Sequence, residues 1–223
     1  MAVVARLLPR LLMPLGATLL TALPIAPAAA VAIIPALQSF SPGVVGGNDA
    51  FAGSIGWDFR LERPYTVGAL GFYDAEDPGL LSPHEVAIFS ADSRAKLVSA
   101  WIPAGTAAPL RGDFRWIPIT ATTLAPGSYV VAAGMPGGGG ASFDPFVALA
   151  ADPLMASGVV LGGRALSGVG SSAQPLVFPD QDEDSFAGFY GPNFATVPAP
   201  LPLLGGATAL GWSRRLRRRR RAA

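Results

Sequence analysis

Short runs in which apolar and polar residues alternate dominate the middle of the chain and constrain the fold most strongly. Trp57, Phe59 and Leu61 share one face of the first clear run, and similar runs follow up to residue 131. A period of two residues is typical of a half-buried β-strand. Pro-Gly pairs at 78–79 and 126–127 mark turns between the runs. The pattern predicts an all-β fold, a single antiparallel β-sandwich of the jelly-roll or immunoglobulin-like kind.

The composition agrees with this prediction and limits how the fold is stabilised. The 223 residues include 27 Gly and 22 Pro, which suits many turns between short strands better than long helices. There is no cysteine, so neither disulfides nor thiolate metal ligands are available. The length suits one domain, which we place at residues 31–196.

The alternation weakens after residue 141. The pattern there predicts a short helix at 148–155, a strand at 159–166 and a further strand at 173–178. We expect this part to complete the same sandwich, because the apolar residues 175–178 would otherwise remain uncovered.

Charge is distributed unevenly along the chain. Nine of the 16 basic residues lie in the two ends, whereas all 15 acidic residues lie between Asp49 and Asp184. Seven basic against 15 acidic residues give the body a formal charge of −8. An acidic body is repelled by nucleic acid and by anionic lipid, so we expect no nucleic-acid partner.

Residues 1–30 have the three parts of a secretory signal peptide. A basic segment is followed by an apolar stretch of about a dozen residues and then by small residues. Ala28 and Ala30 predict cleavage after Ala30, and Ala30 with Ala32 predicts it after Ala32; both sites stay open. The apolar stretch is shorter than the ~20 residues that a membrane span needs, and Pro14 interrupts it.

Residues 197–223 form a tail with three successive parts. Pro198, Pro200 and Pro202 disfavour both helix and strand. A short Gly-rich apolar stretch follows as far as Trp212, and we expect a short hydrophobic helix there. Seven arginines come directly after it and would stop translocation on the cytoplasmic side: Arg214, Arg215, Arg217, Arg218, Arg219, Arg220 and Arg221. A nucleic-acid patch would explain the arginines but not the adjoining apolar stretch and prolines.

The tail resembles the PEP-CTERM sorting signal of Gram-negative bacteria. The motif here is Val197-Pro198-Ala199-Pro200, with alanine where that family usually has glutamate. The resemblance implies export through the Sec machinery, a transient stay in the inner membrane and cleavage by an exosortase-type enzyme. It also implies a final location at the cell surface or outside the cell.

Residues 57–134 also resemble a small β-sandwich domain of unknown function found in other bacterial proteins with sorting tails. The resemblance rests on residues 67–74, 84–89 and 124–131. It implies a fold and no activity.

The sequence offers no recognisable catalytic constellation. The single histidine, His84, opens a predicted strand, where a half-exposed edge residue is expected more often than a general base. Neither a nucleophile elbow nor a phosphate-binding loop is present in the sequence. We expect a protein that is not an enzyme, with a hydrolase of unrecognised site as an alternative.

Two acidic clusters are candidates for cation binding. Asp180, Asp182 and Asp184 alternate as the oxygen ligands of calcium loops do, but the rest of the calcium-loop pattern is missing. The three carboxylates in residues 74–77 follow a strand, where such residues commonly form turns. A solvated acidic loop is the favoured interpretation of both clusters. Calcium at one of them is the alternative, and no other cofactor is expected.

Aromatic residues suggest a second function. Trp57, Tyr73, Trp101 or Trp116 would stack on sugar rings if exposed, although aromatic residues of alternating strands more often pack in a core. The favoured function is an exported surface or extracellular-matrix protein with a structural or adhesive role. The alternative is a carbohydrate-binding module for the exopolysaccharide that the cell itself makes, as in a biofilm.

Overall fold

The computed structural model describes residues 32–41, 44–46, 52–74, 79–136, 144–148, 152–169, 176–183 and 186–197. All of them belong to the unit that begins at Val31. The signal peptide at 1–30, the expected hydrophobic helix and the tail from Pro198 onward lie outside the described residues. Within the described part, no helix is long and apolar enough to cross a membrane.

The described residues form strands and no helix, so the all-β prediction is confirmed. The strands are β1 Ile34–Pro35, β2 Leu37–Ser39, β3 Val44–Gly46, β4 Ala52–Leu61, β5 Tyr65–Tyr73, β6 His84–Ser90, β7 Lys96–Ile102, β8 Leu110–Arg111, β9 Phe114–Leu124, β10 Gly127–Pro136, β11 Phe146–Ala148, β12 Leu154–Met155, β13 Val159–Val169, β14 Gln181–Asp182, β15 Phe189–Tyr190 and β16 Pro192–Thr196.

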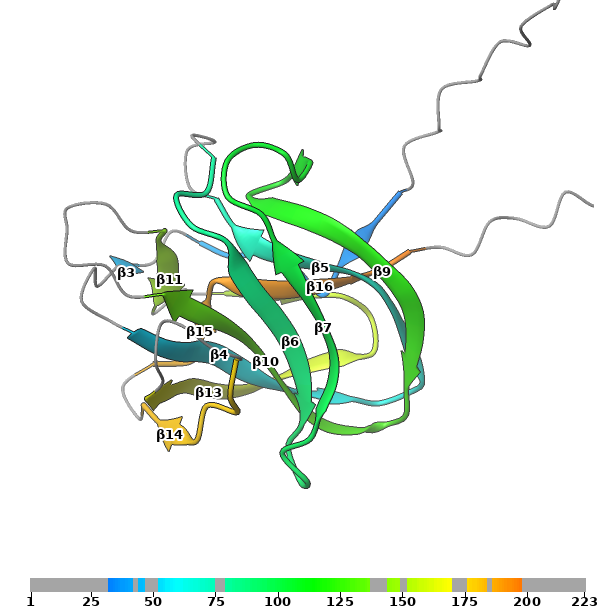
Figure 1. Cartoon of the computed structure of the whole chain (residues 1–223). Coiled ribbons are helices and arrows are strands. Elements are labelled where there is room, and N and C mark those ends of the chain that lie inside the picture. Colours follow the sequence, from blue (N-terminus) through cyan, green and yellow to red (C-terminus); the bar gives the residue numbers. More distant parts are fainter. Residues whose placement is uncertain are drawn as a thin grey trace, which may run out of the picture. The chain divides into compact units, whose positions relative to one another are not determined.

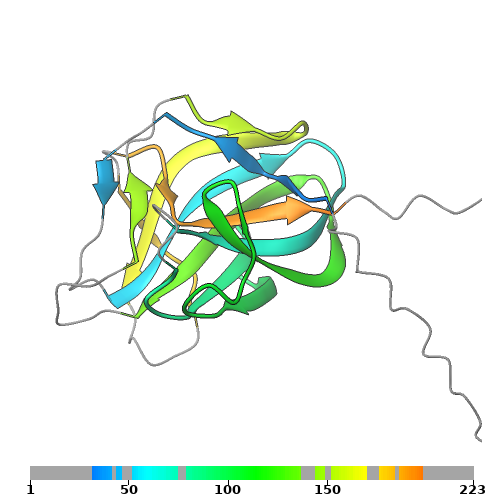
Figure 2. The same cartoon turned by 90° about the horizontal axis from the view of Figure 1, so that it is seen from above.

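Two curved antiparallel sheets form the predicted sandwich. One has the strand order β1-β16-β5-β9-β8, and the other has the order β14-β13-β4-β10-β6-β7. Figure 1 shows β5, β16 and β9 arching over β4, β10, β6 and β7, and Figure 2 shows the same layers from above. The small sheet β15-β11-β3 lies at one end of the sandwich (Figure 1).

Alternation along the strands decides which side chains enter the core. Trp57, Phe59 and Leu61 of β4 are each at most 1% exposed. The rings of Phe59 and Phe194 lie 4.6 Å apart and join β4 to β16 in the opposite sheet. Burying an aromatic or aliphatic side chain of this kind stabilises a fold by about 1.5–3 kcal/mol. The face predicted for β4 from its period of two is therefore the face that packs.

The outer face of the six-stranded sheet carries a second, smaller apolar cluster. Phe89 of β6, Val130 of β10 and Leu166 of β13 are buried there against Leu176. Residues 176–178 pair with no strand, so the strand predicted at 173–178 is wrong for these residues. A side chain holds this segment in place instead of strand pairing. The amide of Leu176 donates a 2.8 Å hydrogen bond to Glu85 Oε2.

The helix predicted at 148–155 is also wrong where the structure describes it. β11 ends at Ala148 and β12 holds Leu154 and Met155, while residues 149–151 lie outside the described part. Asp152 has a φ of 51°, and the proline that follows it lacks an amide donor, so neither fits a right-handed helix. The strand predicted at 159–166 is confirmed as β13.

Candidate functional site

A cleft of about 380 Å³ opens between the N-terminal segment and the β8–β9 hairpin. Residues 32–40 form one wall, and residues 111–114 form the other. Pockets that hold small ligands have volumes of about 300–1,000 Å³, so the cleft lies at the small end of that range.

A buried asparagine fixes the N-terminal wall. Asn193 of β16 is fully buried; its Oδ1 accepts a hydrogen bond from the amide of Leu37 at 3.2 Å, and its Nδ2 donates to the carbonyl of Leu37 at 2.9 Å. The amide of Ala36 also donates to the carbonyl of Phe194 at 2.7 Å. These bonds hold the N-terminal segment against the last strand.

A tight turn and two backbone contacts fix the hairpin wall. Arg111 pairs with Phe114, which leaves Gly112 and Asp113 as a two-residue turn. Gly112 has a φ of 58°, a conformation that glycine adopts without the strain of a side chain. The carbonyl of Asp113 accepts a 2.9 Å bond from the amide of Asp74, and that of Arg111 accepts a 3.1 Å bond from Trp116 Nε1.

The cleft combines aromatic rings with polar side chains. Phe40 stacks on the buried Tyr190 with ring centroids 5.9 Å apart and meets Phe114 edge-on at 6.4 Å. Four exposed polar residues also line the cleft: Gln38, Ser39, Arg111 and Asp113. Among the described residues, the structure gives their side chains no hydrogen bond or ion pair.

No family model, curated protein or solved structure matches this chain. The function of its sites therefore has to be inferred from the chain's own residues. Sequence reasoning missed the cleft, because its two walls are some 70 residues apart in the chain and meet only through the strand order of one sheet.

His84 is not the half-exposed edge residue that the sequence suggested. It is fully buried at the start of β6, which lies between β10 and β7. Its Nδ1 lies 2.9 Å from the carbonyl of Gly134, and its Nε2 lies 2.9 Å from Asp144 Oδ2. A carbonyl and an ionised carboxylate are acceptors, so these two contacts hold the ring between β10 and Asp144. The ring also stacks on Phe72 at 3.9 Å, which makes His84 part of the core.

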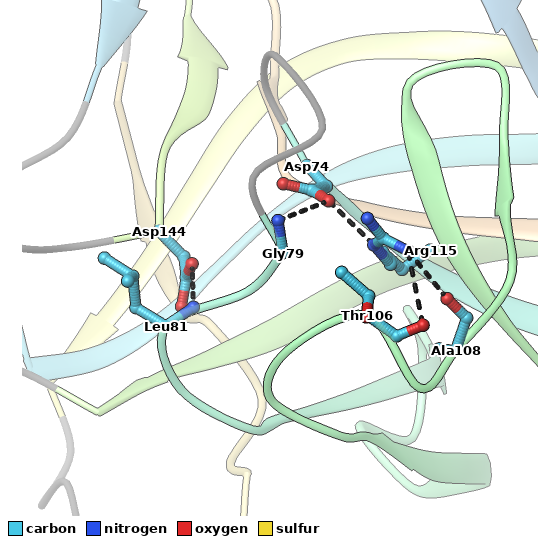
Figure 3. Close-up of polar contacts among 7 residues, drawn as sticks. All are labelled: Asp74, Gly79, Leu81, Thr106, Ala108, Arg115 and Asp144. Atoms are coloured by element: carbon cyan, nitrogen blue, oxygen red, sulfur yellow. Dashed lines mark hydrogen bonds and ion pairs between the residues drawn. The ribbon is translucent and has the colours of Figure 1, made fainter.

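Asp144 links this histidine to the chain segment before β6. Its two carboxylate oxygens accept hydrogen bonds from the amides of Leu81, at 2.6 Å, and Ser82, at 2.8 Å (Figure 3 draws the Leu81 contact). Burial raises the pKa of Asp144, but the hydrogen bonds from His84 and the two amides outweigh it, so the pKa lies below its usual range. The ionised carboxylate therefore stabilises the fold.

A buried ion pair joins Asp74, the residue that follows β5, to Arg115 of β9. Arg115 Nε donates to Asp74 Oδ2 at 2.7 Å, and both side chains are at most 4% exposed (Figure 3). Arg115 Nη1 also donates to the carbonyl of Ala108 at 3.1 Å. The solvated-loop interpretation of residues 74–77 is thus wrong for Asp74, because Asp74 is buried and pairs with a buried arginine of the neighbouring strand β9. Glu76 and Asp77 lie outside the described residues.

Two of the three candidate calcium residues lie near an arginine. Asp180 Oδ2 lies 4.0 Å from Arg94, and Asp182 Oδ2 lies 3.7 Å from Arg164. Asp184 lies outside the described residues. In the ranges that the structure describes, no three histidine, aspartate or glutamate side chains gather in a way that would hold a metal ion. Calcium at this loop stays a prediction.

The aromatic candidates for sugar stacking divide into two groups. Trp57 and Trp116 are at most 3% exposed and belong to the core, so neither offers an open ring face. Trp101 is 57% exposed on the edge strand β7, and Tyr73 is half-buried. The four residues do not form one platform.

Val197 is the one described residue of the sorting motif. It is half-buried and directly follows β16, where it packs over Gly68 of β5. Pro198, Ala199 and Pro200, the arginine cluster and the signal-peptide residues Ala28 and Ala30 lie outside the described part.

Proposed function

We propose that the protein is an exported cell-surface or extracellular-matrix protein with a structural or adhesive role, processed at both ends of its chain. One observation carries the proposal: β1 begins at Ile34 and β16 ends at Thr196. These limits lie just inside the expected cuts, after Ala30 or Ala32 and near Pro198. The strands therefore coincide with the chain that would remain after processing.

The pairing of the first and last strands supports release of an intact body. β1 pairs antiparallel with β16, with Ile34 opposite Thr196 and Pro35 opposite Ala195. Both cuts would then fall at the same edge of one sheet and would leave every described strand pairing in place. A fold that keeps its hydrogen bonds after both cuts has no need to rearrange on delivery.

The position of His84 supports a role without catalysis. Both ring nitrogens are engaged by Gly134 and Asp144, and the side chain has no exposed surface. A general base has to reach the proton that it removes, and this ring faces the core.

Terminal-peptide mass spectrometry on the native protein tests the proposal. The protein is recovered separately from the inner membrane, the outer membrane and the medium. We expect a chain that starts at Val31 or Ile33, ends near Pro198 and occurs outside the inner membrane. An intact arginine tail confined to the inner membrane would contradict the proposal and make the tail a permanent anchor.

A pair of substitutions sharpens this test. Pro198→Ala with Pro200→Ala is expected to leave an uncut precursor in the inner membrane, because the proline motif is where the processing enzyme would act. Pro64→Ala, which changes an exposed proline of the body, is the matched control and should be processed normally. Normal processing of the double variant would count against recognition of the motif.

A further inference from the structure

We propose that the cleft between residues 32–40 and 111–114 binds an uncharged pyranose unit of a saccharide. The inference stands on the cleft alone and does not depend on processing of the tail. The sequence suggested carbohydrate binding but did not indicate a site for it, and this proposal assigns it to the cleft.

The aromatic rings of the cleft match the apolar side of a sugar ring. A pyranose presents axial C–H bonds on one face and hydroxyl groups around its rim, so it needs a flat apolar surface flanked by polar groups. Phe40 lines the cleft and stacks on the buried Tyr190 at an interplanar angle of 19°. Aromatic side chains of this kind provide a large apolar contact with fixed geometry.

The polar side chains match the hydroxyl groups. Arg111 only donates, an ionised Asp113 only accepts, and Gln38 and Ser39 do both. Each sugar hydroxyl is itself both a donor and an acceptor, so this set satisfies neighbouring hydroxyls of either orientation. The one positive and one negative side chain offset each other, which favours a neutral ligand over a phosphate or another strong anion.

Both walls are held in place before a ligand arrives. Asn193 ties Leu37 to β16, and the carbonyl of Asp113 accepts a hydrogen bond from the amide of Asp74, directly after β5. Binding then requires ordering of a few exposed side chains and little change of backbone, which lowers its entropic cost. The donors and acceptors at the rim are unpaired among the described residues, so a sugar does not have to displace existing bonds.

Calorimetric titration of the native protein tests the site. The probes are tetrasaccharides of glucose, galactose and N-acetylglucosamine, oligosaccharides released from the polymer of the producing cell, and inorganic phosphate. We expect at least one saccharide to bind with a Kd of about 1 mM or tighter, and phosphate not to compete.

Two exposed substitutions locate the binding. Gln38→Ala and Asp113→Ala are each expected to weaken it about tenfold, a loss of about 1.4 kcal/mol. Asp92→Ala, an exposed carboxylate in the turn between β6 and β7, is the matched control and should bind normally. Unfolding curves of the variants check that each is folded.

Three results would overturn the site. They are no heat of binding with any saccharide at 10 mM probe, equal binding by the Asp113→Ala variant, and displacement of the sugar by phosphate. Loss of this proposal would leave the expected termini unchanged, and an unprocessed tail would leave the cleft unchanged, so the two proposals fail separately.

Discussion

Replacing Arg115 by methionine is expected to lower the free energy of unfolding by about 3–5 kcal/mol, because it leaves a buried carboxylate without its partner. Asp74 is 4% exposed, and its Oδ2 would keep only the 3.3 Å bond from the amide of Gly79 among the contacts drawn in Figure 3. Methionine fills a similar volume, so the loss reports charge and hydrogen bonding more than a cavity. Urea unfolding followed by tryptophan fluorescence measures it.

The exposed pair of Arg60 and Glu62 supplies the matched control for this prediction. Its atoms lie 3.3 Å apart, but both side chains are more than half exposed. Water screens such a pair, so Arg60→Met should cost less than about 1 kcal/mol. The double variant Asp74→Asn with Arg115→Met should recover part of the loss, since no buried charge then remains unpaired. Equal effects of Arg115→Met and Arg60→Met would refute the assignment of a buried, stabilising pair.

Replacing Asp144 by asparagine is expected to lower the free energy of unfolding by about 3 kcal/mol near neutral pH, a size typical of leaving buried donors without their acceptor. Asparagine keeps the shape but removes the negative charge that faces His84 Nε2 at 2.9 Å. Its amide group also brings a donor towards groups that already donate: the amides of Leu81 and Ser82 and the imidazole. Asp180→Asn is the control, because that carboxylate is exposed and 4.0 Å from Arg94.

The effect of Asp144→Asn should depend on pH in one direction. The pKa of Asp144 in the folded protein lies below its usual range, so the ionised form stabilises the fold. This stabilisation is complete above the unfolded pKa of about 3.9 and is lost as the pH falls through the lower folded pKa. The difference between wild type and variant should therefore shrink as the pH falls below about 4. A difference that grows as the pH falls below about 4 would contradict this.

Local patterns along the chain were sufficient to predict the class of fold. Trp57 and Phe59 alternate with polar residues, and a period of two directs them to one side of a strand whatever the strand pairs with. The same logic placed β13 correctly. It failed at the described residues of 148–155, where β12 pairs with β2, and at residues 176–178, which Glu85 holds through the amide of Leu176.

The sequence by itself determined the all-β class, the inward face of β4, the acidic body and the ends that predict export. Only the tertiary structure decided the roles of His84 and Asp74, because their partners Asp144 and Arg115 lie 60 and 41 residues away. The cleft also depends on the tertiary structure. Gln38 and Asp113 come together because β16, β5 and β9 are adjacent in one sheet. A side chain's spacing sets which face of a strand it occupies, whereas strand pairing over long distances sets which groups it meets.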